Sequence, residues 1–151
     1  MHFEKAAAAA LLTGTTLAML PLQAADAATA APFRVTKVQY DSPGSDNRSN
    51  ASLNAEYLQV KNVTRQAQSL SRWTVRDAQN HVYTFPAVTV APGAIVTLHT
   101  GSGVNGQGNL YWRAGNYVWN NTGDSALLRT PAGATVQTVR WTSLGAGWRT
   151  F

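Results

Sequence analysis

Cysteine is absent from the chain of 151 residues. Its absence excludes disulfide bonds, thiolate metal sites and a cysteine nucleophile. It also removes the residue to which a lipid anchor of an exported protein would be attached. The fold must therefore be stabilised by burial alone, and a domain of this size buries somewhat over ~60% of the surface of its unfolded chain, which is adequate.

A long hydrophobic run is also missing, apart from one interrupted segment at the N-terminus. The first thirty residues contain one lysine near the start, then an apolar run broken by Thr13-Gly14-Thr15-Thr16, and end on Ala28-Thr29-Ala30. A membrane-spanning helix needs roughly 20 consecutive apolar residues, and this run is shorter. We therefore predict a secretory signal peptide over residues 1–30 and a secreted domain over residues 31–151 that does not insert into the membrane.

Acidic residues are few, seven against twelve lysines and arginines. Once Lys5, Glu4 and Asp26 leave with the predicted signal peptide, 11 basic and 5 acidic residues remain, a net charge of +6. This balance is compatible with weak, non-specific binding to nucleic acid, with an anionic cell-wall polymer or with lipid headgroups. It is equally compatible with an ordinary soluble surface, which we favour.

Three of the remaining acids, Asp41, Asp46 and Glu56, flank two asparagines and could supply oxygen ligands to a calcium ion. Their spacing fits no established calcium loop, so a polar connector with Asx turns is the favoured alternative. We predict no metal and no cofactor.

A helical period of useful length is missing after residue 30, and short β-rich runs alternate with turn residues instead. This pattern predicts an antiparallel all-β sandwich, preceded by the signal peptide. The first run places Phe33, Val35 and Lys37 on one face and Val38 and Tyr40 on the other. Residues 41–54 are predicted to form a long loop. Strands are expected over residues 33–40, 56–63, 70–77, 81–85, 94–100, 109–113, 117–119, 126–130 and 135–141.

The same alternation identifies part of the core. Trp73 and Val75 share one strand face and should meet Tyr83 and Phe85 across the next strand, inside the sandwich. The residues after 141 show no period, and we expect them to fray or to pack through Trp148 and Phe151.

Catalytic motifs are weak. Gly101-Ser102-Gly103-Val104-Asn105-Gly106 matches G-x-G-x-x-G, but an aromatic strand follows it rather than the helix on which a pyrophosphate would rest. The two histidines after residue 30, His81 and His99, lie in strand patterns, and no Gly-x-Ser-x-Gly elbow is present. We predict that the protein is not an enzyme, and a hydrolase with His99 as its base is the less favoured alternative.

Aromatic residues are concentrated at Tyr111, Trp112, Tyr117 and Trp119, with Arg113 among them. Alternation lets about half of them point into a core, so the others could contact a carbohydrate, a peptide or a nucleic acid. Tyr111, Trp112, Arg113 and Trp119 are therefore the candidate partner-binding residues. The alternative is that they cover an open end of the sandwich.

A signature turn follows these aromatics in Trp119-Asn120-Asn121-Thr122-Gly123-Asp124. Asn and Gly tolerate left-handed backbone, and an Asp side chain can cap such a turn. We expect Gly123 to have a positive φ and Asp124 to accept backbone N–H groups of the turn. Trp73, Asn120, Asn121, Gly123 and Asp124 are thus predicted to be structural.

This turn and five earlier segments, in this order along the chain, resemble the lamin tail domain, an immunoglobulin-like β-sandwich. The earlier segments are Asn54-Ala55-Glu56-Tyr57-Leu58-Gln59-Val60-Lys61-Asn62, the stretch from Leu70 to Asp77, Tyr83-Thr84-Phe85-Pro86, Val90-Ala91-Pro92-Gly93 and His99-Thr100-Gly101-Ser102-Gly103. The chain is most similar to small exported bacterial members in which the domain stands alone after a signal peptide. In animals the domain ends the nuclear lamins, and in bacteria it also accompanies secreted nucleases.

The resemblance implies a non-catalytic extracellular binding or structural module whose partner is an unknown extracellular protein or glycan. A nucleic-acid-binding accessory module is the alternative. We expect a monomer. The resemblance supplies no catalytic residue.

Overall fold

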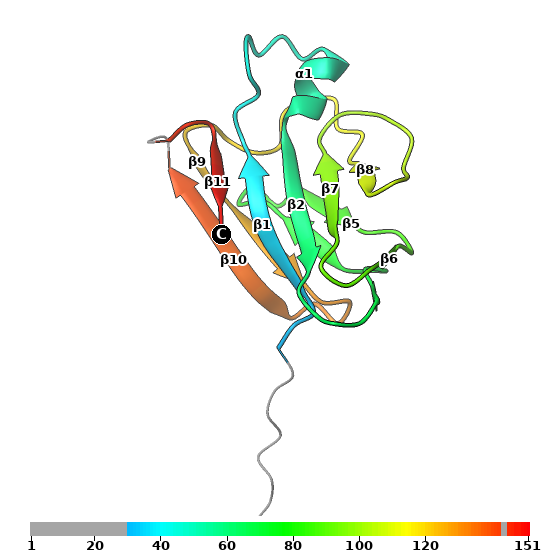
Figure 1. Cartoon of the computed structure of the whole chain (residues 1–151). Coiled ribbons are helices and arrows are strands. Elements are labelled where there is room, and N and C mark those ends of the chain that lie inside the picture. Colours follow the sequence, from blue (N-terminus) through cyan, green and yellow to red (C-terminus); the bar gives the residue numbers. More distant parts are fainter. Residues whose placement is uncertain (1–29, 143–144) are drawn as a thin grey trace, which may run out of the picture.

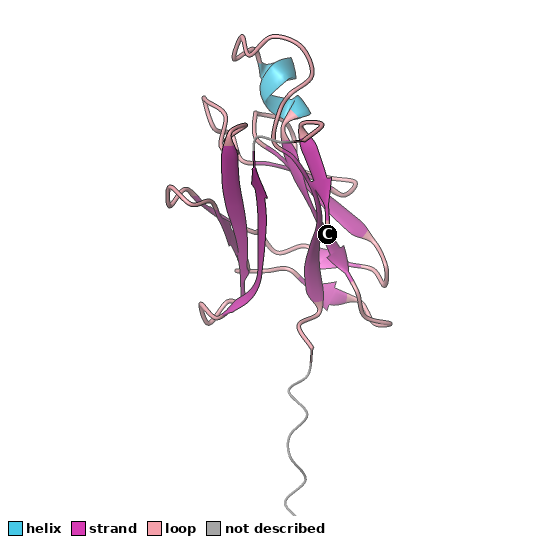
Figure 2. Cartoon of the chain, turned by 90° about the vertical axis from the view of Figure 1, so that its left-hand side faces the viewer, coloured by secondary structure: helices cyan, strands magenta, loops and turns pink. Residues whose placement is uncertain are grey.

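Two β-sheets packed face to face form the body of the molecule. The structure is a computed structural model that describes residues 30–142 and 145–151 (Figure 1). The predicted signal peptide therefore lies outside the described residues, apart from Ala30. Figure 2 shows the sheets edge-on as two layers, with the single described helix at one end.

The larger sheet has five strands and faces the viewer in Figure 1. Its strands pair antiparallel except β7 and β8, which are parallel. In spatial order they are β11 (Trp148–Thr150), β1 (Phe33–Gln39), β2 (Tyr57–Asn62), β7 (Ile95–His99) and β8 (Asn109–Tyr111).

The second sheet has four antiparallel strands. In spatial order they are β10 (Thr135–Thr142), β9 (Gly123–Arg129), β4 (Thr74–Arg76) and β5 (Val82–Thr84). A short pair, β3 (Gln68–Ser69) and β6 (Thr89–Val90), lies apart from both sheets. The predicted antiparallel sandwich is thus confirmed, with the β7–β8 pair as a parallel exception.

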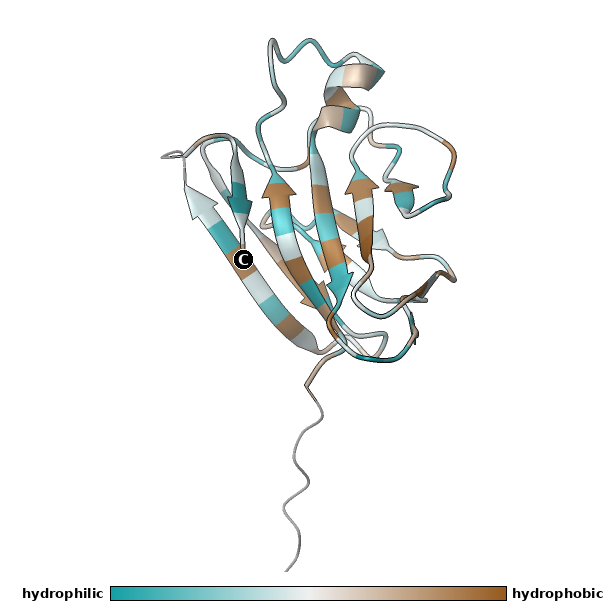
Figure 3. Ribbon diagram, in the orientation of Figure 1, coloured by the Kyte–Doolittle hydropathy of each residue, from teal (hydrophilic) through white to brown (hydrophobic). Residues whose placement is uncertain are grey.

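The core lies between the two sheets and follows from period-2 alternation. On β2, Leu58 and Val60 are buried while the residues between them are half-exposed, and β7 repeats the pattern (Figure 3). Trp73 is buried and packs edge-on against Phe33, with ring centroids 5.1 Å apart. Val75 lies opposite Tyr83. The predicted inward face of residues 70–77 is therefore confirmed.

The first strand corrects a prediction. The pairing of β1 with β2 shifts register between Val35 and Lys37, which is the mark of a β-bulge. The extra residue returns Val38 and Tyr40 to the inner face, so both are buried on the same side as Phe33 and Val35. The expected opposite orientation of Val38 and Tyr40 is wrong, because simple alternation assumes an uninterrupted strand.

The predicted loop over residues 41–54 ends in a one-and-a-half-turn helix, α1 (Asn50–Ala55). Ser49 caps it, since the Ser49 hydroxyl accepts the N–H of Ser52 at 3.2 Å. Leu53 is the buried residue of the helix. α1 is the single helix within residues 30–142 and 145–151, and it lacks the length and apolar character needed to cross a membrane.

Two further segments differ from expectation. Residues 117–119 are not a strand, because the N–H groups of Val118 and Trp119 are bound by the Glu56 side chain rather than by a neighbouring backbone. Residues 148–150, where no period is visible, form β11 and pair with β1. Beyond β11 the edge of β1 is covered by Gln137, whose side-chain amide accepts the N–H of Val35 at 2.7 Å and donates to its carbonyl at 3.2 Å.

Candidate binding surface

The signature turn is hydrogen-bonded to neighbouring loops. Asp124 is buried, and its carboxylate accepts the N–H groups of Asn120 at 3.1 Å, Ala78 at 3.0 Å and Ser125 at 2.7 Å. The bond from Asn120 is the expected one, whereas the bond from Ala78 ties the turn to the β4–β5 connection. Gly123 has φ 130, and a Cβ there would lie 3.3 Å from the carbonyl oxygen of Trp141.

The two asparagines of the signature turn, Asn120 and Asn121, make further hydrogen bonds to neighbouring segments. The side chain of Asn121 donates to Asp41 at 3.0 Å and to Asp46 at 3.4 Å. The Asn120 carbonyl accepts the indole N–H of Trp141 at 2.9 Å. These bonds use the polar groups of the turn to hold neighbouring segments together.

Glu56 is fully buried and lies between the end of α1 and the start of β2. Its Oε1 accepts the Thr100 hydroxyl at 2.6 Å and the N–H groups of Val118 at 2.7 Å and Trp119 at 3.3 Å. Its Oε2 is buried without a hydrogen-bond partner. Burial raises the pKa of Glu56 from 4.5 to about 7, against the lowering effect of these hydrogen bonds and with a small addition from the negative charge of Asp46.

The three acids considered as calcium ligands do not form a shared site. Asp41 and Asp46 both face Asn121, whereas Glu56 turns inward to residues 118–119. Within the described parts of the chain, no group of three or more His, Asp or Glu side chains could hold a metal ion. The hydrogen bonds of Asp41 and Asp46 agree with the favoured alternative, in which these residues belong to a polar connecting segment.

All five acidic residues of the described chain lie at the end of the sandwich that carries α1. Two are in the connection after β1, one lies between α1 and β2, one follows β4 and one is the second residue of β9. In this order they are Asp41, Asp46, Glu56, Asp77 and Asp124. Two arginines lie in connections at the opposite end, Arg65 after β2 and Arg72 before β4. Arg48 and Arg113 lie at the α1 end, so the acids of the described chain are confined to one end whereas the arginines are not.

The two histidines occupy different settings. His81 is exposed, and its Nδ1 lies 2.6 Å from the carboxylate of the buried Asp77, four residues away. His99 is half-buried on β7, and its Nδ1 donates to the Asn54 carbonyl at 2.8 Å. Its Nε2 lies 3.0 Å from the Asn109 side-chain amide. In the described part of the chain no serine or threonine hydroxyl bonds to either imidazole, so neither forms a nucleophile–base pair.

Two clefts border the loop before β8. One of about 270 Å³ is lined by Val88, Val96 and neighbouring residues of the loop, and one of about 350 Å³ is lined by the loop and Tyr111. Neither contains a carboxylate or a histidine. These clefts lack the titratable pairs that general acid–base chemistry requires.

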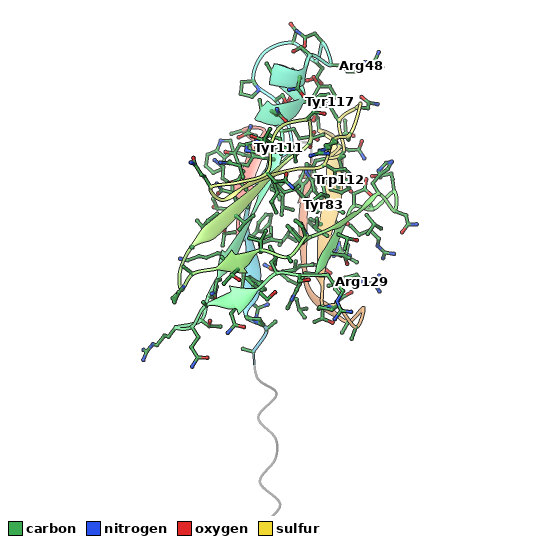
Figure 4. The ribbon with its side chains drawn as sticks, turned by 90° about the vertical axis from the view of Figure 1, so that its right-hand side faces the viewer. Arg48, Tyr83, Tyr111, Trp112, Tyr117 and Arg129 are labelled. Carbon is green, nitrogen blue, oxygen red and sulfur yellow. The ribbon has the colours of Figure 1, made fainter. Side chains whose placement is uncertain are left out.

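The candidate aromatic group is divided by the fold. Trp119 is only 1% exposed, because it packs edge-on against Trp112 at 5.8 Å and Trp141 at 5.9 Å, so its selection as a surface residue is wrong. Trp112 is half-buried and lies 5.5 Å from the ring of Tyr83, and Figure 4 shows the two rings together between the layers. Trp112 thus belongs largely to the alternative in which aromatics close an end of the sandwich.

Tyr111 and Arg113 remain accessible but face different ways. Arg113 is exposed just after β8 with φ 62. Tyr111 lies on the outer face of the five-stranded sheet, where its ring stacks on His99 with centroids 5.1 Å apart and planes 21° apart. Figure 4 shows Tyr111 on the side of that sheet, away from Trp112. The structure therefore does not assemble the predicted four-residue site.

A different group of aromatics meets Tyr111 on this outer face. Strand pairing puts Trp148 opposite Gln39, Gln39 opposite Tyr57, Tyr57 opposite His99 and His99 opposite Tyr111, one position from each of the five strands. Tyr57 lies 6.0 Å from His99. We name the rings of this line and the neighbouring β1 lysine the aromatic row; its members are Trp148, Tyr57, His99, Tyr111 and, two residues before Gln39 in the adjacent register row, Lys37.

Lys37 joins the two halves of the aromatic row. Its ammonium lies 5.4 Å from the ring centroid of Tyr57 and 5.2 Å from that of Trp148, within cation–π range of both. Trp148 is 43% exposed, the largest exposure among the described tryptophans, while Tyr57, His99 and Tyr111 are half-exposed. Apart from Tyr111, sequence reasoning missed this row. The outward positions of Tyr57 and Lys61 on β2 were its one local signal.

The two aligned sheets define an immunoglobulin-like β-sandwich. The family model of the lamin tail domain matches residues 26–143, and the chain belongs to that family. No curated protein matches the chain.

Proposed function

We propose that the protein is an exported, non-catalytic binding module and that its ligand lies across the outer face of the five-stranded sheet. The observation that carries this proposal is the aromatic row, in which half-exposed rings and a lysine from five strands share one surface. Accessible aromatic rings beside a cation on a rigid sheet supply contact area at low entropic cost.

The polar groups that might do chemistry are occupied elsewhere. Asp124 and Glu56 each bind backbone N–H groups, and Asp77 holds His81. The clefts beside β8 carry no carboxylate or imidazole. This supports a binding role over the hydrolase alternative.

Export is supported by the N-terminal sequence, with its apolar segment and its Ala28-Thr29-Ala30 cleavage pattern. The extracellular space or the cell envelope is then the compartment in which the ligand is met. The proposed module acts as a monomer, which light scattering of the secreted protein measures directly.

The test is retention of the secreted protein on isolated cell envelope. A double variant, Lys37→Gln with Trp148→Ala, changes the aromatic row. Its matched control, Arg140→Gln with Phe151→Ala, makes the same chemical changes at exposed positions outside the row. We expect the first variant to lose retention and the control to keep it. Equal retention of both, or no retention of the native protein on envelope or on any component of the culture supernatant, would overturn the proposal.

The nucleic-acid alternative has its own observation. The four-stranded sheet carries one outward-facing arginine on each of three strands, β4, β9 and β10. These are Arg76, Arg129 and Arg140. Arg72, however, lies before β4 with φ 61 rather than on the strand, so the basic surface has no regular phosphate spacing along one strand. Titration with duplex and single-stranded DNA at low and physiological salt tests this alternative. We expect weak binding that disappears as salt rises, because only counterion release drives it.

A further inference from the structure

The ligand class can be read from the chemistry around the aromatic row. We propose that the outer face of the five-stranded sheet binds an anionic polysaccharide whose sugars carry carboxylates, with Lys37 pairing with a carboxylate between Tyr57 and Trp148. This inference rests on the proposed function, whose binding surface it uses.

The dimensions of the row suit a chain rather than a single sugar. Five neighbouring strands contribute to it, and four strand spacings of about 4.8 Å give a length of about 19 Å. No helix packs over this face in Figure 1, and α1 stands at the end of the sandwich. A linear polymer can therefore lie across the strands along the row.

The neighbouring positions are polar in a way that suits sugar hydroxyls. The adjacent register row consists of Thr150, Lys37, Gln59, Thr97 and Asn109, which supply amide, hydroxyl and ammonium groups. Such groups can donate to and accept from hydroxyls on both sides of an aromatic contact. The middle of this face is polar at Gln59 and Thr97, and its exposed aliphatic side chain, Ile95, lies near one end.

The charge of the face selects an acidic sugar. Lys37 and Lys61 both point outward from it. The acids of the described chain do not share this face, because Glu56, Asp77 and Asp124 are buried. The remaining two, Asp41 and Asp46, lie in the connection after β1 and face Asn121. The Lys37 ammonium is held between two rings without a carboxylate partner in the described structure. A sugar carboxylate would complete a charge-assisted hydrogen bond there, and the exposed indole of Trp148 would receive the C–H groups of the sugar ring.

Single-stranded nucleic acid fits this face less well. It relies on bases stacking on free ring faces. Here His99 and Tyr111 stack on each other, which covers one ring face of each. Gly103 lies against the Tyr111 ring, because a Cβ at that glycine would be 2.4 Å from Tyr111 Cζ. The groups left for a ligand on this face are ring edges, hydroxyls and amides. These groups suit the hydroxyls of sugars better than the flat faces of bases.

The experiment is calorimetric titration of the secreted protein with sodium polygalacturonate, with neutral dextran as the uncharged control polymer. We expect binding to polygalacturonate and none to dextran. Lys37→Gln should weaken binding about tenfold, the factor given by losing one charge-assisted hydrogen bond. Lys37→Arg should restore it. The matched control Arg140→Gln removes the same charge from the other sheet and should leave the affinity unchanged.

A spectroscopic readout locates the site. The protein has five tryptophans, so five indole N–H resonances report separately on their surroundings. Polygalacturonate should shift the resonance of Trp148, and Trp148→Ala should weaken binding while Phe151→Ala does not. Thermal midpoints of the variants confirm that each remains folded.

Three results would overturn the inference. Equal weakening by Lys37→Gln and Arg140→Gln would mean diffuse attraction to total charge. Tighter binding of single-stranded DNA through the same residues would mean a nucleic-acid ligand. Absence of polygalacturonate binding, with retention on envelope still dependent on the aromatic row, would refute the acidic sugar and leave the proposed function standing.

Discussion

Glu56 should make the stability of this protein fall as pH rises through the weakly acidic range. The group is buried, and its pKa is about 7 in the folded chain against 4.5 for an ordinary glutamate. Between these values the folded state holds a proton that the unfolded state has lost, so the free energy of unfolding decreases with pH. Below pH 4.5 both states are protonated, and above pH 7 both are ionised, so Glu56 contributes no slope there.

The size of the effect follows from the two pKa values. The difference between 4.5 and about 7 corresponds to about 3 kcal/mol of unfolding free energy lost across that interval. Glu56→Gln removes the titration while its amide oxygen still accepts the N–H groups of Val118 and Trp119. Its amide nitrogen replaces the unpartnered Oε2, which adds a cost that does not depend on pH.

Urea denaturation of both proteins at pH values from 4 to 8 measures the difference. We expect the native protein to lose stability relative to Glu56→Gln between pH 4.5 and 7, with parallel curves on either side. Asp46→Asn makes the same change at an exposed carboxylate and should shift the curve only slightly. A difference that is flat across this range, or that grows in the opposite direction, would refute the reasoning and mean that the three hydrogen bonds at Oε1 outweigh burial.

Three other predictions concern the core, the signature turn and export. Trp73→Ala should cost about 3–5 kcal/mol, as expected for a buried aromatic, while the same change at the exposed Trp148 should cost less than about 1 kcal/mol. Equal thermal midpoints for the two variants would contradict the core assignment. Asp124→Ala should lower stability by about 2–3 kcal/mol because it leaves buried N–H groups without an acceptor, whereas Asp41→Ala, which removes an exposed carboxylate, should change it by about 0.5 kcal/mol or less. Similar denaturation midpoints for these two would contradict a structural role and make Asp124 a candidate ligand or catalytic residue. Mass spectrometry of the secreted protein should find Ala31 at the N-terminus, and an intact residue 1 would exclude signal cleavage.

The sandwich and much of its core could be predicted from the sequence because the relevant information is local. Leu58 and Val60, or Trp73 and Val75, alternate with polar residues, and one buried face per strand is enough to specify a sandwich. The bulge in β1 was missed because one extra residue leaves no mark in the apolar pattern. The helix α1 was missed because six residues with one buried leucine show no period.

The candidate surface was harder to predict because it depends on pairing between distant segments. Tyr57 and Trp148 are separated by most of the chain and share a surface only through β1. By contrast, Trp112 and Trp119 are close in sequence, and both pack around the end of the sandwich. Closeness in sequence suggested a cluster of contact residues where the fold builds a closing layer. Register between strands decides which aromatics reach solvent, and register is not visible in one strand alone.

The placement of every described acid at the α1 end has a consequence for how the molecule moves near other charges. Arginines lie at both ends, Arg48 and Arg113 beside α1 and Arg65 and Arg72 opposite, so the end without acids is the more positive of the two. Near a negatively charged surface that end is attracted more strongly than the α1 end. At physiological ionic strength the field reaches only about 8 Å, so the alignment is set during the last step of approach.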